Sequence, residues 1–313
     1  MKITAKNYAA QAERALLEFT KKLPPDEYNV DIRLIDAQTN MIKSAIHFAV
    51  PDGGTIMNDN FKGLKDMEVR LPFPTITIEY FAGENQTGRP TDIVCKKRLV
   101  IACEVDRVFI ENRIQTEIDS DKWILVYAAC TLPDGLWVPE ISAWAFPCKW
   151  DQKVEVKETI GRIDDSNRPR LIGAQLCLPK FYKNAVEKYG ETIARENTSR
   201  DISMEVAVVM ELCEALSCSN VTHEPIEKIN QSVNTRRVRD GKLPLYETHC
   251  LIINAGKSSA ATYGALACNH ASPRQHLRRG HIRRLPEKNI WVNSCVVGDK
   301  NNGVIEKQYA VLH

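Results

Sequence analysis

The sequence predicts an α+β protein with a strand-rich N-terminal half, a helical middle and a C-terminal β-ribbon. Short apolar runs that alternate, or that are rich in β-branched and aromatic residues, dominate residues 31–150. Apolar residues then recur at helical spacing between residues 180 and 239, and strand-like patterns return after residue 246. A chain of 313 residues that is 43% hydrophobic and 26% charged is typical of globular proteins, so the composition excludes wholesale disorder.

The N-terminal half begins with an amphipathic helix. Its apolar positions recur at steps of three and four residues, at Tyr8, Ala12, Ala15, Leu16 and Phe19. Pro24 and Pro25 end this helix near Leu23. The strands predicted after it are 30–35, 43–50, 75–81, 98–105, 108–112 and 123–131, followed by a strand pair at 136–146, with a hairpin around Asp106 and a turn at 133–135.

The character of the sequence changes near residue 150. Residues 151–170 are polar and form the best linker candidate, which divides the chain into a β-rich domain at 1–150 and an α+β domain at 151–313. One integrated domain is the alternative. The second half predicts helices at 180–196, 201–216 (with Asp201 as the N-cap) and 224–239, then strands at 246–254, 277–285, 289–297 and 304–312.

The sequence predicts a cytoplasmic protein that does not enter a membrane. No apolar run approaches the roughly 20 residues that span a bilayer, and the N-terminal segment carries charges among its apolar positions, unlike a secretory signal. The ten cysteines form no C-x-x-C pair and lie mostly in apolar stretches, which is typical of buried thiols in a reducing compartment.

Charge is distributed unevenly along the chain. Residues 1–220 hold 28 Lys and Arg against 33 Asp and Glu, a balance of −5, whereas residues 221–290 hold 12 against 5, a balance of +7. Two clusters make up most of the basic excess, one at 236–242 and one at 274–288. Most of these cations are arginine, the side chain that binds phosphate or carboxylate in a bidentate way.

The second basic cluster predicts a β-ribbon. Residues 277–285 form its first strand, 285–289 its loop and 290–292 its return strand, with Gly280 as a bulge or a point of close approach. A basic ribbon with an aromatic residue at its base suits the phosphate backbone of a nucleic acid. The predicted phosphate-binding residues are Arg236, Arg237, Arg239, Arg274, Arg278, Arg279, Arg283, Arg284 and Trp291. The first three are expected to extend the surface that the others form.

Other functions fit the same segment. Its charges also suit an edge strand protected from aggregation, or a surface that binds an acidic protein. If the chain is an enzyme, His276 and His281 are the candidate general acid and base of a metal-independent phosphodiesterase. On a regular strand these two histidines face opposite sides, so this chemistry requires the bulge at Gly280.

The sequence predicts no metal site and no cofactor. Cys268, His270, His276 and His281 lie close together in the sequence, but no pair has the spacing of a zinc ribbon, and six cations lie beside them. The chain contains no dinucleotide-binding, P-loop, zinc-protease or EF-hand pattern.

Three segments resemble an uncharacterised family encoded by tailed bacteriophages and prophages. They are LPFPTITIEY at 71–80, NTRRVRDGKLPL at 234–245, and HLRRGHIRR at 276–284 with the following Trp291. The resemblance implies a phage origin and work in the cytoplasm of a bacterial host cell, and it carries no catalytic residue with it. The predicted function is therefore nucleic-acid binding by a phage protein. The alternatives are inhibition of a host or anti-phage defence enzyme by protein contact, and the histidine phosphodiesterase; a homo-oligomer stays open.

Overall fold

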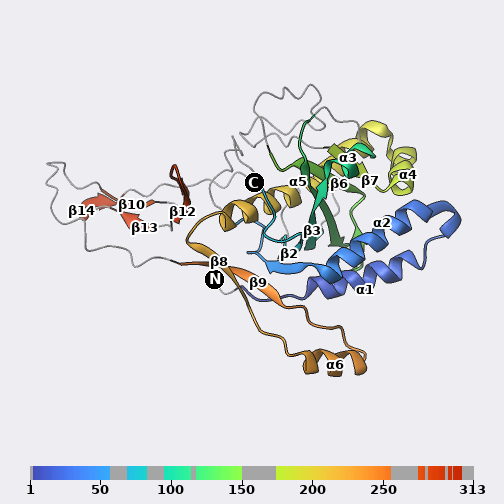
Figure 1. The fold of residues 1–313 in the computed structure, drawn as a ribbon, viewed down its shortest axis with the longest axis horizontal. Coiled ribbons are helices and arrows are strands. Elements are labelled where there is room, and N and C mark those ends of the chain that lie inside the picture. Colours follow the sequence, from blue (N-terminus) through green and yellow to red (C-terminus); the bar gives the residue numbers. More distant parts are fainter. Residues whose placement is uncertain are drawn as a thin grey trace.

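A computed structural model describes most of the chain. The described residues are 3–56, 69–82, 95–113, 118–149, 174–254, 274–278, 281–292, 295–297 and 299–304. Their helices are α1 (Tyr8–Thr20), α2 (Pro25–Ser44), α3 (Arg107–Glu111), α4 (Pro179–Tyr189), α5 (Glu191–Leu216) and α6 (Gln231–Arg239). The structure is α+β, with its long strands mainly in the N-terminal half, as the sequence predicts (Figure 1).

A nine-stranded mixed sheet forms the centre of the molecule. Its strands are β1 (Ile46–Ala49), β2 (Thr75–Phe81), β3 (Lys97–Asp106), β4 (Lys122–Thr131), β5 (Trp137–Pro139), β6 (Ser142–Pro147), β7 (Ala174–Cys177), β8 (Val221–Pro225) and β9 (Thr248–Ile253). The order across the sheet is β7-β6-β4-β3-β2-β1-β9-β8, and β5 pairs with β4. β1 is parallel to both of its neighbours, and the other pairs are antiparallel. Strands from before and after residue 150 therefore share one sheet.

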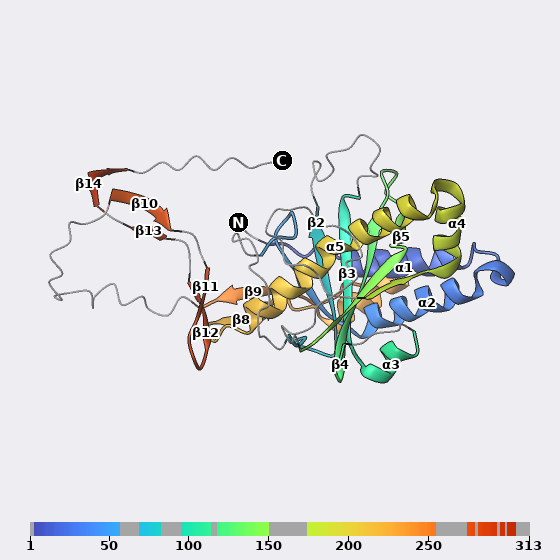
Figure 2. The same cartoon turned by 90° about the horizontal axis from the view of Figure 1, so that it is seen from above.

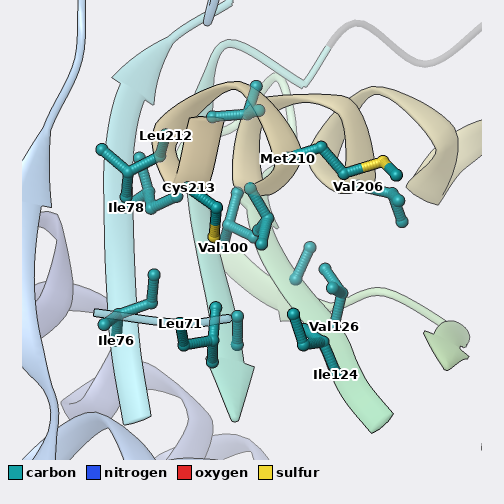
Figure 3. Packing of buried hydrophobic residues seen from close by; sticks show 14 of the residues in the cluster. Leu71, Ile76, Ile78, Val100, Ile124, Val126, Val206, Met210, Leu212 and Cys213 are labelled. Carbon is teal, nitrogen blue, oxygen red and sulfur yellow. The ribbon is translucent and has the colours of Figure 1, made fainter. Parts of the chain in front are cut away.

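Helices cover both faces of this sheet. α5 packs on one face, where Val206, Met210 and Cys213 lie against apolar side chains of the central strands (Figure 3). α1 and α2 lie together on the other face (Figure 2). There Leu16 and Ile35 pack in one apolar cluster with side chains of β3. Because both faces are covered, β3 and β4 are nearly continuous apolar runs rather than alternating ones.

The predicted strand at 30–35 is wrong, because these residues lie inside α2. Pro24 is its N-cap and Pro25 its first helical residue, a position that suits proline because the first turn needs no N–H. The buried side chains of α2 recur at helical spacing, at Asp31, Ile35, Gln38, Thr39 and Ile42. The prolines therefore start a second helix as well as ending the first. The predicted strand at 43–50 shrinks to β1, which follows α2 almost directly.

The predicted hairpin around Asp106 is also wrong. Residues 107–111 form α3, and β3 pairs with β2 and β4 instead. The predicted 136–146 strand pair corresponds to β5 and β6, which both pair with β4.

All three predicted helices in the middle of the chain have different bounds. The helix predicted at 180–196 is divided, because α4 ends at Tyr189. α5 begins at Glu191, so Asp201 lies inside it and is not an N-cap. Gly190, with φ +82° and ψ 155°, separates α4 from α5 in a conformation that other residues avoid. The predicted helix at 224–239 is the strand β8 followed by α6. The predicted linker at 151–170 lies outside the described residues.

Candidate nucleic-acid interface

The predicted basic strand at 277–285 is two strands in separate small sheets. β10 (Arg274–Arg278) pairs with β13 (Cys295–Val297) and β14 (Asp299–Val304), whereas β11 (His281–Arg284) pairs with β12 (Asn289–Val292). A single ribbon strand is therefore wrong. The predicted return strand at 290–292 is present as β12. Residues 279 and 280 lie outside the described residues, so Arg279 and the bulge at Gly280 have no structural account. The strand predicted at 304–312 starts where β14 ends, and residues 305–313 also lie outside.

β11 and β12 form an antiparallel hairpin. Its register pairs Ile282 with Trp291 and Arg283 with Ile290. The turn is closed by two backbone hydrogen bonds, in which Leu285 N donates to Lys288 O at 2.9 Å and Lys288 N donates to Leu285 O at 3.4 Å. Only Pro286 and Glu287 lie between the closing residues, which gives a tight loop at the place that the sequence predicts.

Asn220 fixes this hairpin to the main sheet. Its Nδ2 donates to Trp291 O at 2.8 Å, and its Oδ1 accepts from Trp291 N at 2.8 Å. One carboxamide thus pairs with both backbone groups of Trp291, as a neighbouring strand would. Next to it, Ser219 N donates to Asn289 O at 2.9 Å, and Asn289 Nδ2 donates to Ser217 Oγ at 3.2 Å. β12 is therefore held against the segment that joins the end of α5 to β8 (Figure 1).

The exposed side chains of the hairpin include two cations. Arg283 and Lys288 are exposed, and neither makes an ion pair with any residue that the structure describes. Glu287 in the turn is an exposed anion. Ile282 and Trp291, the cross-strand pair, are half-buried. The exposed guanidinium of Arg283 is thus available to an anion in solution.

The structure does not bring the candidate catalytic histidines together on one strand. His276 lies in β10 opposite Val297, and His281 lies in β11 opposite Val292. Arg274 and Arg278 lie in β10, and Arg284 lies in β11 opposite Asn289. The two histidines therefore lie in different small sheets.

The first basic cluster lies elsewhere. Arg236, Arg237 and Arg239 belong to α6, which Figure 1 shows on the far side of β8 and β9 from β12. The expectation that they extend the hairpin surface is therefore wrong. Arg236 and Arg239 lie 3.9 and 3.6 Å from the carboxylate of Asp240, and Arg237 Nε donates to Leu243 O at 2.9 Å. Each of these arginines thus has a contact within its own helix or loop.

One close histidine pair was not found from the sequence. His223 of β8 and His249 of β9 place their Nδ1 atoms 3.0 Å apart, with the ring of Phe48 beside both. Burial and the neighbouring His223 lower the pKa of His249. The two histidines are 26 residues apart, and only the pairing of β8 with β9 brings them together. No sequence spacing could have shown this.

Among the described residues, one group of three side chains is close enough to hold a metal ion. The Sγ atoms of Cys95 and Cys130 and a carboxylate oxygen of Glu140 lie within 4.8 Å of one another. Arg98 Nη1 is 2.9 Å from that carboxylate, so the site already contains a cation. This guanidinium disfavours a metal ion there.

The described part of the chain contains no helix long and apolar enough to cross a membrane. Comparison with known proteins finds no family model that matches the chain, no matching curated protein and no matching solved structure. The resemblance to a phage family therefore stays a prediction.

Proposed function

We propose that this protein binds nucleic acid through the β11–β12 hairpin. The observation that carries the proposal is the geometry of this hairpin: a tight ribbon with exposed Arg283 and Lys288, fixed by Asn220 to the main sheet. A fixed ribbon holds its cations in place before binding, which reduces the entropy lost when phosphates bind. Phosphate contacts of this kind release counterions and give affinity that depends on salt.

The amino-acid composition around the hairpin supports this choice. Residues 274–288 contain Arg274, Arg278, Arg279, Arg283, Arg284 and Lys288 against the single anion Glu287. Under the proposal Trp291 supports the ribbon from below, because its backbone is engaged by Asn220 and its side chain is half-buried.

Fluorescence polarisation tests the proposal. Labelled single- and double-stranded DNA and RNA are titrated with the intact chain and with a variant in which Arg278, Arg279, Arg283 and Arg284 are alanine. We expect the variant to lose at least about tenfold in affinity at low salt, because phosphate contacts supply most non-specific binding. The products are run on a gel afterwards, and shortened strands would support the phosphodiesterase instead.

Two further variants locate the surface. A control in which Arg14, Lys22, Lys183 and Lys188 are alanine removes the same charge from exposed positions around α1 and α4, and we expect it to bind like the intact chain. A variant with Arg236, Arg237 and Arg239 changed to glutamine tests α6. The proposal would be contradicted if the α6 variant lost binding and the hairpin variant bound like the intact chain. If the intact chain bound no nucleic acid, an acidic protein partner would be favoured.

A further inference from the structure

A second site lies on the opposite part of the sheet from the hairpin. An open cavity of about 590 Å³ lies between α2, the strands β4, β6 and β7, and the residues that lead into α4. Its volume falls within the range of roughly 300–1,000 Å³ that is usual for small-molecule sites. None of the nucleic-acid-binding residues predicted from the sequence lines it.

One buried polar atom that lines this cavity has no hydrogen-bond partner, and a half-buried hydroxyl lies on the same wall. Gln38 of α2 lines the cavity and is only 2% exposed, yet its Oε1 accepts no hydrogen bond in the structure. Tyr127 of β4 also lines it, and its side chain is half-buried. Burial raises the pKa of Tyr127, so the hydroxyl stays protonated and can donate. Buried polar groups are nearly always paired, so the unpartnered Oε1 of Gln38 indicates a missing partner.

The same cavity is lined by two cations. Arg33 of α2 and Arg113, which follows α3, are exposed residues on its wall. Arg113 is held in place, since its guanidinium lies 3.6 Å from the centre of the Phe109 ring and its Nη1 donates to Phe109 O at 3.0 Å. The one anion on the wall is Glu140, which is already paired with Arg98 at 2.9 Å. The uncompensated charge of the cavity is therefore positive.

The remaining wall is largely apolar. Leu34, Ala143 and Leu176 contribute to it from α2, β6 and β7. A ligand that suits all three features has an anionic group for the arginines, a flat apolar body and a polar edge for a carboxamide. A glutamine carboxamide can pair with the edge of a nucleobase, and guanidinium groups bind phosphate.

We propose that this cavity binds a nucleoside monophosphate, with the phosphate at Arg33 and Arg113 and the base edge at Gln38 and Tyr127. The inference is independent of the hairpin, because it rests on residues of α2, β4 and the segment after α3. It gives the protein a small-ligand site in addition to a polymer-binding surface.

Calorimetric titration of the intact chain with AMP, GMP, CMP and UMP tests this site. At least one of these is expected to bind more tightly than either inorganic phosphate or the matching nucleoside, since each of those satisfies only part of the site. Gln38→Leu is expected to weaken that binding at least about tenfold, because the variant loses one hydrogen bond to the ligand. The same variant should not lower the melting temperature, because it removes an unpaired buried polar atom.

Tyr127→Phe and Arg113→Gln are independent variants, and each should weaken the same nucleotide. The hairpin variant with four alanines should bind it like the intact chain, which separates this site from the proposed function. The inference is overturned if no mononucleotide binds, if Gln38→Leu and Tyr127→Phe both bind as tightly as the intact chain, or if only the hairpin variant loses the nucleotide.

Discussion

His47 is a buried histidine whose surroundings exclude its charged form. It is 6% exposed on β1, its Nδ1 lies 2.7 Å from Thr77 Oγ1, and its ring lies 4.4 Å from the ring of Tyr246. Burial, and to a smaller extent the nearby His249, lower its pKa from 6.5 to about 4. In the unfolded chain the same histidine would take up a proton near pH 6.5.

This difference predicts a stability that falls in mild acid. Between pH 6.5 and 4 the unfolded state binds more protons than the folded state, so the free energy of unfolding rises with pH across this window. From pH 7 to pH 5, His47 is expected to lower the free energy of unfolding by about 2 kcal/mol. Urea unfolding at the two pH values measures it, and His47→Gln should remove that part of the difference. An unchanged pH dependence in the variant would contradict this account.

Arg98 is the second residue whose environment makes a sharp prediction. Its Nη1 lies 2.9 Å from Glu140 and 3.1 Å from Glu205, and Glu205 is 1% exposed and also accepts from the Tyr80 hydroxyl at 3.1 Å. Burial raises the pKa of Glu205, and the guanidinium of Arg98 opposes that rise. Removal of the guanidinium leaves two carboxylates without their cation.

Arg98→Met is therefore expected to destabilise the fold by about 3–5 kcal/mol, the usual cost of breaking a buried ion pair. Denaturant unfolding measures this loss. Arg14→Ala is the matched control, because Arg14 and Glu18 form an exposed pair and such pairs contribute at most about 1 kcal/mol. If both variants lowered the free energy of unfolding by a similarly small amount, the buried ion pairs of Arg98 would not stabilise the fold more than an exposed pair does.

At the scale of elements, Asn220 is the side chain that holds Trp291 of the hairpin in position. Asn220 makes both of its side-chain hydrogen bonds to the backbone of Trp291. Asn220→Ala should release β12 locally, so the Trp291 amide is expected to exchange with solvent at least about tenfold faster. Nucleic-acid affinity should fall severalfold, because the cations are no longer held in place.

Hydrogen exchange with residue resolution checks this. The control is Asn254→Ala, since the Asn254 side chain donates to Thr222 within the β8–β9 pair and not to the hairpin. Unchanged exchange at Trp291 in Asn220→Ala would show that another contact holds the hairpin.

Local sequence patterns predicted some elements well and failed at others for physical reasons. The helix at 8–19 and the strand at 75–81 match α1 and β2, because their periodicity comes from a single buried face or a run of β-formers. Residues 30–35 alternate like a strand but follow two prolines that start a helix. The basic hairpin turn was predictable from Pro286, but its attachment to Asn220 joins residues 71 apart and left no local signal.

The small-ligand cavity could not be predicted at all from local patterns. Gln38, Tyr127 and Arg113 come from three separate elements, and only the packing of α2 on the sheet brings them to one cavity. Gln38 carries no unusual pattern in the sequence. Its significance comes from being buried without a hydrogen-bond partner, which requires the three-dimensional structure.

At the scale of the whole molecule, the hairpin and the cavity lie at different parts of the central sheet. The nine-stranded sheet ends at β7 on one edge and β8 on the other. The hairpin lies beside β8 (Figure 2). The cavity is lined by residues of β4, β6 and β7. Two sites at opposite edges of one sheet can be changed independently, so a hairpin variant and a cavity variant should have additive effects.

The salt dependence of binding tests the central claim most directly. Affinity for a labelled single-stranded oligonucleotide is measured over a series of KCl concentrations for the intact chain and for Arg283→Ala/Lys288→Ala. Each lost phosphate contact should reduce the steepness of log affinity against log salt by about 0.7, so the double variant should give a clearly shallower line. The charge-matched variant Lys183→Ala/Lys188→Ala should keep the slope of the intact chain. Equal slopes for the intact chain and the hairpin variant would contradict binding at the β11–β12 hairpin.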